Sequence, residues 1–114
     1  MDIRERGLGA ARAFLERLDW RVIDAADPGI EGADILAVDG DTLVAVIVRV
    51  GGRSEELQDN PTVEELGELL TSLEFRREEL GPGSTGGTRV DLIDLLVIAE
   101  DRALLRHHRV VGSV

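Results

Sequence analysis

Asp34 and Arg49 are the residues of this sequence whose types and spacing first suggest chemistry. Asp34 lies near the start of the segment 33–39, and Arg49 lies inside the segment 42–50, two positions after Ile47. If these segments are adjacent strands, period-two geometry puts positions 47 and 49 on one face, beside the aspartate. A carboxylate there is a ligand for a hard cation such as Mg²⁺, and a guanidinium can bind a phosphate bidentately. The chemistry to consider is therefore the binding of a hard cation or of a phosphate group.

Structural roles compete with this chemistry at both residues. A single buried carboxylate can be satisfied by nearby backbone amides, so Asp34 can instead be a strand-end residue. Arg49 is suited to phosphate, but we expect it to pair with Asp34 across the hairpin, which neutralises both groups. Ile47 supplies no ligand, and one carboxylate with waters holds Mg²⁺ weakly, because the ion gives up its hydration shell reluctantly. Asp34 is therefore the one candidate metal ligand.

The composition favours a single domain that has no cysteine chemistry and no membrane-spanning segment. The 114 residues are 43% hydrophobic, which suits a single domain over residues 1–114 with a modest core. No segment approaches the ~18 consecutive apolar residues of a membrane span. The charged N-terminus is unlike a secretory signal, so we expect a cytoplasmic location. The absence of cysteine excludes disulfides, thiolate zinc sites and thiol catalysis.

The charge balance bears on the class of partner. There are 23 acidic residues against 13 basic ones, all of them arginine, and the formal net charge is -10. Phosphate backbones are bound mainly by Lys and Arg, so this charge disfavours nucleic acid. An acidic surface serves either solubility or contact with a basic partner. A nucleic-acid groove would require five arginines to converge, namely Arg12, Arg49, Arg53, Arg76 and Arg77.

The elements that must position these residues follow from hydrophobic periodicity. Two segments have the apolar period of amphipathic helices, 1–18 and 61–80. Five segments have strand character, namely 20–24, 33–39, 42–50, 89–100 and parts of 103–111. The sequence Asp-Gly-Asp predicts a tight hairpin between the second and third of these strands. Thr62 and Glu65 fit a capping box at the start of the second helix.

The order helix, three strands, helix, two strands predicts the fold class. A strand meander followed by a helical crossover gives an α/β domain with a mixed central sheet flanked by helices. The segment 42–50 is apolar at nearly every position, so we expect it at the sheet centre, covered on both faces. Gly7 and Gly9 weaken the first helix, so that part either frays or approaches another backbone closely. The glycine-rich stretch 81–87 is interpreted as a flexible connector.

Two other pairs of polar residues suggest sites but have strand geometry against them. His107 and His108 are neighbours in a strand and point to opposite faces, so they cannot easily chelate one ion. We expect them to be surface or edge-strand residues. Asp91 and Asp94 are three positions apart and also lie on opposite faces, so they form no carboxylate dyad.

Three stretches carry a likeness to one known family. The stretch "EGADILAVDGDTLVAVIVR" is similar to the pattern G-E-I-D-L-I-A-x-D-G-D-T-L-V-F-V-E-V-K, which Asp34, Ala37 and residues 39–44 fit. The stretch "RGLGAARAFLERLDWRVID" is similar to G-E-x-x-A-x-x-Y/W-L followed by a hydrophobic strand. In "RVDLIDLLVI", Asp91 falls on the aspartate of R-F-D-V-V-A-V. On these motifs nearly the whole chain resembles the YraN family, small bacterial proteins with a predicted nuclease-like core.

The resemblance implies a restriction-endonuclease-like αβββαβ(β) core, of the PD-(D/E)xK superfamily, but the chain departs from its site residues. The first glutamate of the family's motif aligns with Gly32, the glutamate of its catalytic strand with Ile47, and the lysine with Arg49. A further glutamate of the family falls on Leu8. A guanidinium stays protonated and cannot transfer protons as a lysine can. Asp34 and Arg49 are thus the vestiges of a catalytic site, and no cofactor is expected.

We therefore expect a nuclease-like fold that is catalytically inactive and acts as a protein-interaction or structural domain, with a second copy or another protein as partner. The alternative is a nucleic-acid-binding protein or weak metal-dependent endonuclease using Mg²⁺ or Mn²⁺. That alternative needs a replacement ligand. Glu31 lies one residue before Gly32, the position that aligns with the family's glutamate. Asp39 and Asp41 are expected to shape the turn. The sequence contains no motif typical of an enzyme of another class.

Overall fold

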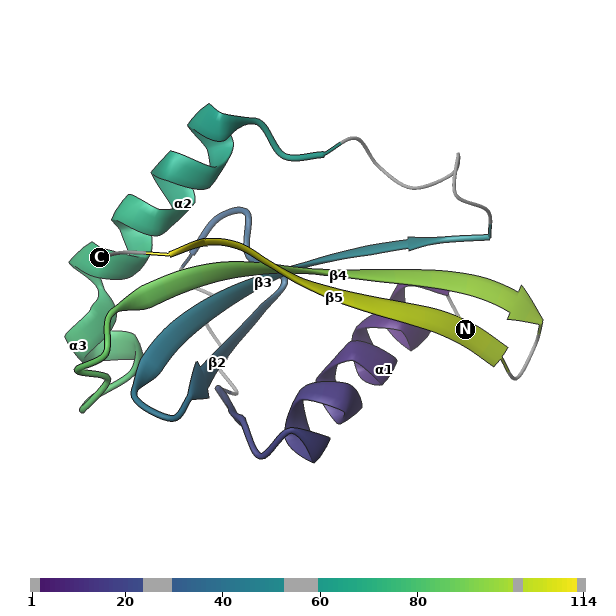
Figure 1. Cartoon of the computed structure of the whole chain (residues 1–114), viewed down its shortest axis with the longest axis horizontal. Helices are drawn as coiled ribbons and strands as arrows, with labels where there is room; N and C mark the ends of the chain where they lie inside the picture. Colours follow the sequence, from purple (N-terminus) through teal and green to yellow (C-terminus); the bar gives the residue numbers. More distant parts are fainter. Residues whose placement is uncertain (1–2, 24–29, 53–59, 100–101, 113–114) are drawn as a thin grey trace.

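Five strands form one mixed sheet, and helices cover both of its faces (Figure 1). The computed structural model describes residues 3–23, 30–52, 60–99 and 102–112. The strands are β1 (Arg21–Ile23), β2 (Ile35–Asp39), β3 (Thr42–Gly51), β4 (Thr88–Ala99) and β5 (Arg102–Gly112). The helices are α1 (Ile3–Arg17), α2 (Val63–Phe75) and α3 (Arg77–Leu80). The predicted order of elements is confirmed, except that the helix expected over 61–80 is divided at Arg76.

The sheet has the strand order β1-β2-β3-β4-β5, so chain order and spatial order agree. The pair β3–β4 is parallel and the other three pairs are antiparallel. A parallel pair needs a crossover connection, and α2 lies in it. The mixed sheet and the central place of the apolar strand β3 are both confirmed.

The side chains of β3 alternate between two cores. Val44, Val46 and Val48 pack on the α1 face, whereas Leu43 and Ala45 pack on the α2 face. All of them are fully buried. Because every second residue points the same way, an apolar run is the only pattern that lets one strand supply both cores. Burying each valine contributes about 1.5–3 kcal/mol.

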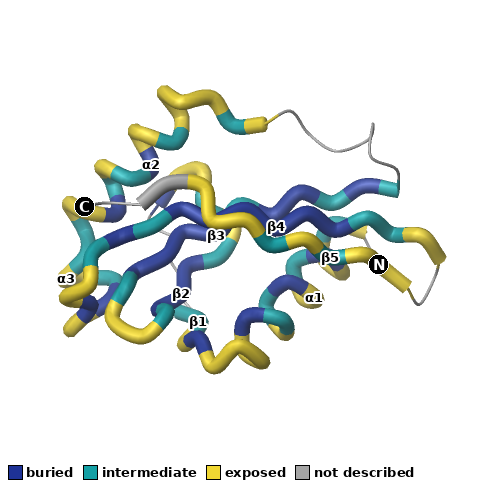
Figure 2. Tube along the Cα trace, viewed as in Figure 1, coloured by how far each residue is buried: buried dark blue, intermediate teal, exposed yellow. Residues whose placement is uncertain are grey.

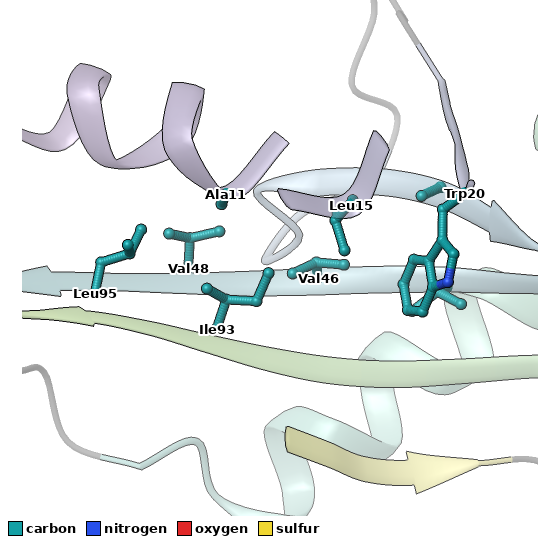
Figure 3. Close-up of a cluster of buried hydrophobic side chains, with 9 residues drawn as sticks. Ala11, Leu15, Trp20, Val46, Val48, Ile93 and Leu95 are labelled. Atoms are coloured by element: carbon teal, nitrogen blue, oxygen red, sulfur yellow. The ribbon is translucent and has the colours of Figure 1, made fainter. Parts of the chain in front are cut away.

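Helix α1 covers one face of the sheet through small and branched side chains. Ala11 and Leu15 lie over Val46, Val48 and Ile93 (Figure 3). The helix packs closely on β3 at Gly7, where a Cβ atom would collide with the side chain of Val50. The close approach predicted for this part of the helix occurs at Gly7, although against a side chain and not a backbone, whereas Gly9 faces open space.

Helix α2 covers the opposite face and begins as predicted. Thr62 accepts a hydrogen bond from the Glu65 amide at 3.1 Å, and the Glu65 carboxylate accepts one from the Thr62 amide at 3.2 Å. Together these bonds form the capping box. Leu69 and Leu73 then bury the inner face of the helix. None of the described helices is long and apolar enough to cross a membrane.

The glycine-rich stretch 81–87 connects α3 to β4, as predicted, and hydrogen bonds hold it in place. Ser84 is buried, and its hydroxyl donates to the Gly81 carbonyl. The Gly86 amide donates to the Asp41 carbonyl at 2.7 Å. These bonds fix the turn against the β2–β3 hairpin. The loop predicted before residue 33 lies mostly outside the described residues.

Candidate functional site

The residues that suggested chemistry do meet in one cleft. It has a volume of about 230 Å³ and lies between the starts of α1, β2 and α2. Its lining residues are Arg4, Gly32, Asp34, Ile47, Arg49, Pro61 and Glu65. The predicted convergence of positions 34, 47 and 49 is thus confirmed.

Asp34 is held by two protein groups. One carboxylate oxygen accepts the Val48 amide at 2.7 Å, and the other accepts the guanidinium of Arg4. Asp34 directly precedes the first residue of β2, so its side chain pairs a β3 amide just beyond the end of the β2–β3 ladder. The structural role considered for Asp34 is therefore confirmed. Its role as a metal ligand stays a prediction.

Arg49 pairs with β4, so the predicted Asp34–Arg49 ion pair is wrong. Its Nε and Nη2 donate to the two carboxylate oxygens of Asp94 at 2.7 and 2.8 Å, and Nη1 donates to Asn60 at 2.8 Å. Arg49 and Asp94 are directly opposite in the parallel β3–β4 register. Both side chains are about nine-tenths buried, with exposed fractions of 10% and 11%. A two-bond pair in this setting fixes the orientation of the guanidinium.

Position 47 contributes hydrocarbon where a metal site would need oxygen. Ile47 packs against the core under α2. A second cavity of about 330 Å³ adjoins the first and is lined by Glu31, Glu65 and Glu68 among others. Within the described part of the chain, no three His, Asp or Glu side chains are grouped so that they could hold a metal ion. Glu31 thus joins no such group with Asp34.

Asp41 lies in the turn of the β2–β3 hairpin, as expected from the sequence, whereas the side chain of Asp39 pairs with β4. Asp39 accepts a hydrogen bond from Arg89 at 3.0 Å. The Asp41 carboxylate accepts the Thr42 hydroxyl at 3.4 Å, and its carbonyl accepts Gly86. Neither aspartate lines the cleft, so neither replaces the glutamate that position 47 lacks.

A second polar cluster, on the α1 face of the sheet, was not found from the sequence. Asp91 is fully buried and accepts Arg89 Nε at 2.7 Å. Its other oxygen lies 2.7 Å from Nε2 of His107. Arg89 also lies over the ring of Trp20, 5.2 Å from the centroid. The cluster joins three strands, because Arg89 of β4 bonds Asp39 of β2 and Asp91 contacts His107 of β5.

His107 is more buried than the sequence predicted. It does lie in the outer strand β5, but its side chain is only 17% exposed. The ring makes edge contacts with Phe14 and Trp20, at centroid distances of 5.7 and 5.5 Å. His108 points away and is about half exposed, which confirms that the two histidines do not share a site. Phe14 and Trp20 are far from His107 in the sequence, so these contacts leave no local sequence signal.

Burial and charge act in opposite directions on Arg89. Burial disfavours its charged form, but the hydrogen bonds and charges of Asp91 and Asp39 outweigh this and raise its pKa. Asp91 and Asp94 have separate partners, Arg89 with His107 and Arg49 respectively. The prediction that the two aspartates form no dyad is confirmed.

The arginines of the hypothetical nucleic-acid groove do not converge. Arg12 lies on α1 and pairs with Glu16. The pair Arg76 and Arg77 lies at the junction of α2 and α3, on the other side of the sheet, and each forms an ion pair with a nearby glutamate. Arg49 is held by Asp94, and Arg53 lies outside the described residues.

A scan against protein-family models finds none that matches this chain, and a search of curated proteins finds no significant match.

Proposed function

We propose that the chain is a catalytically inactive domain of restriction-endonuclease-like fold, of the YraN-like kind, that acts through contact with another protein. The order of its helices and strands agrees with the αβββαβ(β) core expected for that fold. Asp34, Ile47 and Arg49 line one cleft, as the site positions of the YraN-like motif should. These agreements support the fold; the functional part rests on how the cleft residues are bonded.

The observation that carries the inactive interpretation is that Asp34 and Arg49, the polar residues at the motif positions, already have protein partners. Both carboxylate oxygens of Asp34 accept hydrogen bonds, from Val48 and Arg4. Arg49 is fixed by Asp94, and Ile47 is hydrocarbon. A cation in the cleft would compete with the Arg4 guanidinium and the Val48 amide for the Asp34 carboxylate, and Ile47 would add no ligand. Mg²⁺ demands near-octahedral oxygen coordination, so its binding here is unfavourable.

A protein partner fits the charge better than a nucleic acid does. A domain with a net charge of -10 repels phosphate backbones at long range. The described arginines of the hypothetical groove lie on opposite faces of the sheet, so they provide no basic track. The partner is then a second copy of the chain or a different protein.

Calorimetric titration with Mn²⁺ tests the inactive interpretation at the cleft. We expect the wild type and Asp34→Ala to give the same negligible heat, because Arg4 already neutralises the Asp34 carboxylate and Ile47 supplies no ligand. Ile47→Glu introduces a second carboxylate beside Asp34 and should bind Mn²⁺ measurably, which serves as the positive control. Binding by the wild type that Asp34→Ala abolishes would show that the proposal is wrong.

An activity assay completes the test. Branched, single-stranded and duplex DNA are incubated with the protein and Mg²⁺ or Mn²⁺ at low salt, and we expect neither cleavage nor electrophoretic retardation. Asp34→Ala identifies contamination, because a contaminating nuclease acts equally in both preparations. Cleavage by the wild type alone would establish the nuclease alternative.

A further inference from the structure

We propose that β5 binds an extended acidic segment of a partner protein, which joins the sheet as an additional strand. β5 is the outer strand beyond β4, and its side chains are mostly exposed over residues 102–110 (Figure 2). This inference rests on the proposed function as a protein-interaction domain and specifies the chemistry of the partner.

Among the described strands, β5 has a neighbour on one side only, and its other edge can supply the backbone groups for such binding. An edge strand leaves the N–H and C=O groups of every second residue without a strand partner. β5 has 11 residues, enough to pair with a strand of full length, whereas β1 at the opposite edge has 3. In strand addition, backbone hydrogen bonds give affinity and alternate side chains give specificity. β5 is therefore the edge suited to a partner.

The charge of β5 is opposite to that of the whole chain. In a chain of net charge -10, this strand contains no acidic residue. The exposed basic residues of this strand are Arg102, Arg106, His108 and Arg109. Over the described residues, the ion pairs of this strand involve only its histidines and Arg109, which is 3.9 Å from Asp39 and mostly exposed. Arg102 and Arg106 can thus pair with carboxylates on a neighbouring strand.

A second copy of the chain is a poor occupant of this edge. Two β5 strands paired antiparallel about a two-fold axis centred on Arg106 place that arginine opposite its own copy. If the axis passes through Leu104, Arg102 lies opposite Arg106 of the copy. Basic residues directly opposite one another destabilise a strand pair. The same charges that block self-association admit an acidic strand, which gives the edge selectivity.

Fluorescence anisotropy with a labelled peptide of alternating glutamate and valine, about eight residues long, tests the proposal. Glutamates can meet Arg102 and Arg106, and the valines then lie on the opposite face of the sheet, beside Ala103 and Leu105. We expect saturable binding that weakens with salt. A peptide with lysine in place of glutamate should not bind. A peptide methylated at every backbone nitrogen keeps its charge but donates no backbone hydrogen bond, and should also not bind.

Charge-reversal variants locate the binding edge. Arg106→Glu should weaken binding of the acidic peptide about fivefold, because it replaces an attractive cross-strand pair by a repulsive one. Arg102→Glu at the other end of β5 should act in the same direction. The matched control is Arg17→Glu, an equal charge change on the exposed end of α1, which should change affinity less than about twofold. Circular dichroism melting confirms that each variant is folded.

Three outcomes would overturn the proposal. They are no peptide binding by the folded wild type, equal loss in Arg17→Glu and Arg106→Glu, and undiminished binding of the methylated peptide. Competition by a single-stranded oligonucleotide that depends on Arg106 would assign the edge to nucleic acid instead. The Mn²⁺ and cleavage measurements are independent, so failure here leaves the inactive interpretation of the cleft intact.

Discussion

Arg49 and Asp94 lie opposite each other in the parallel pair β3–β4, and their side chains form two hydrogen bonds. Moving both charges out of water costs several kcal/mol, which the two bonds offset because the guanidinium fork matches the carboxylate. The bond from Arg49 to Asn60 adds a third partner. Arg49, whose guanidinium is suited to binding a phosphate, thus links β3 to β4 instead.

A double-mutant cycle measures this commitment. Arg49→Met leaves Asp94 buried without its cation, and we expect it to lower the free energy of unfolding by about 3 kcal/mol. The double variant Arg49→Met/Asp94→Leu removes both charges and should cost less than Arg49→Met alone. Urea unfolding followed by circular dichroism gives the values. Additive costs of the two single substitutions would mean that the residues do not interact.

In the Asp91 cluster, the loss in the free energy of unfolding should be larger where the substituted residue is more deeply buried. Asp91→Ala removes the acceptor of both Arg89 and His107 from a fully buried place, so we expect a loss of about 3 kcal/mol in the free energy of unfolding. Asp39→Ala removes only the second, partly exposed partner of Arg89, and should cost about 1 kcal/mol. Equal losses, measured by urea unfolding, would show that the cluster is not organised around Asp91.

At the scale of elements, the two glycines of α1 have different roles although the sequence places them alike. Gly7 is buried where α1 approaches β3, and Gly9 is exposed. The sequence indicated that glycine weakens this helix, but only the position of β3 relative to α1 reveals which glycine is needed. A helix that packs this closely on a strand buries more of the sheet beneath it.

Substitution of each glycine by alanine separates these roles. Gly7→Ala places a methyl group against Val50, and overpacking should destabilise the protein by about 1–3 kcal/mol. Gly9→Ala meets nothing within 4 Å and should stabilise the helix by up to about 1 kcal/mol, because alanine has the higher helix propensity. Thermal melting distinguishes the opposite shifts. A gain in stability from both substitutions would contradict the close contact at Gly7.

The elements could be predicted from the sequence because their signals are local. The capping box of Thr62 and Glu65, the Asp-Gly-Asp turn and the apolar run of β3 each lie within a few residues. The partners of charged residues could not be predicted in the same way. Asp94 is 45 positions from Arg49, and the two meet only through the parallel register that follows the α2 crossover.

At the scale of the whole molecule, the excess of negative charge should make the folded state sensitive to salt. Ten net negative charges on a small domain repel one another more in the compact state than in the expanded unfolded chain. The Debye length falls from about 30 Å at about 0.01 M salt to about 8 Å at about 0.15 M, which screens repulsion across the molecule.

We therefore expect the free energy of unfolding to rise as NaCl is added over this range. Contacts such as Arg49–Asp94 are buried and lose little by screening, and the exposed pairs such as Arg12–Glu16 contribute little at any salt concentration. Urea is the suitable denaturant, because guanidinium is itself a salt. Sucrose at matched osmolality is the control for solvent exclusion. A fall in stability with NaCl would mean that attractive pairs, and not net repulsion, dominate the electrostatics of this fold.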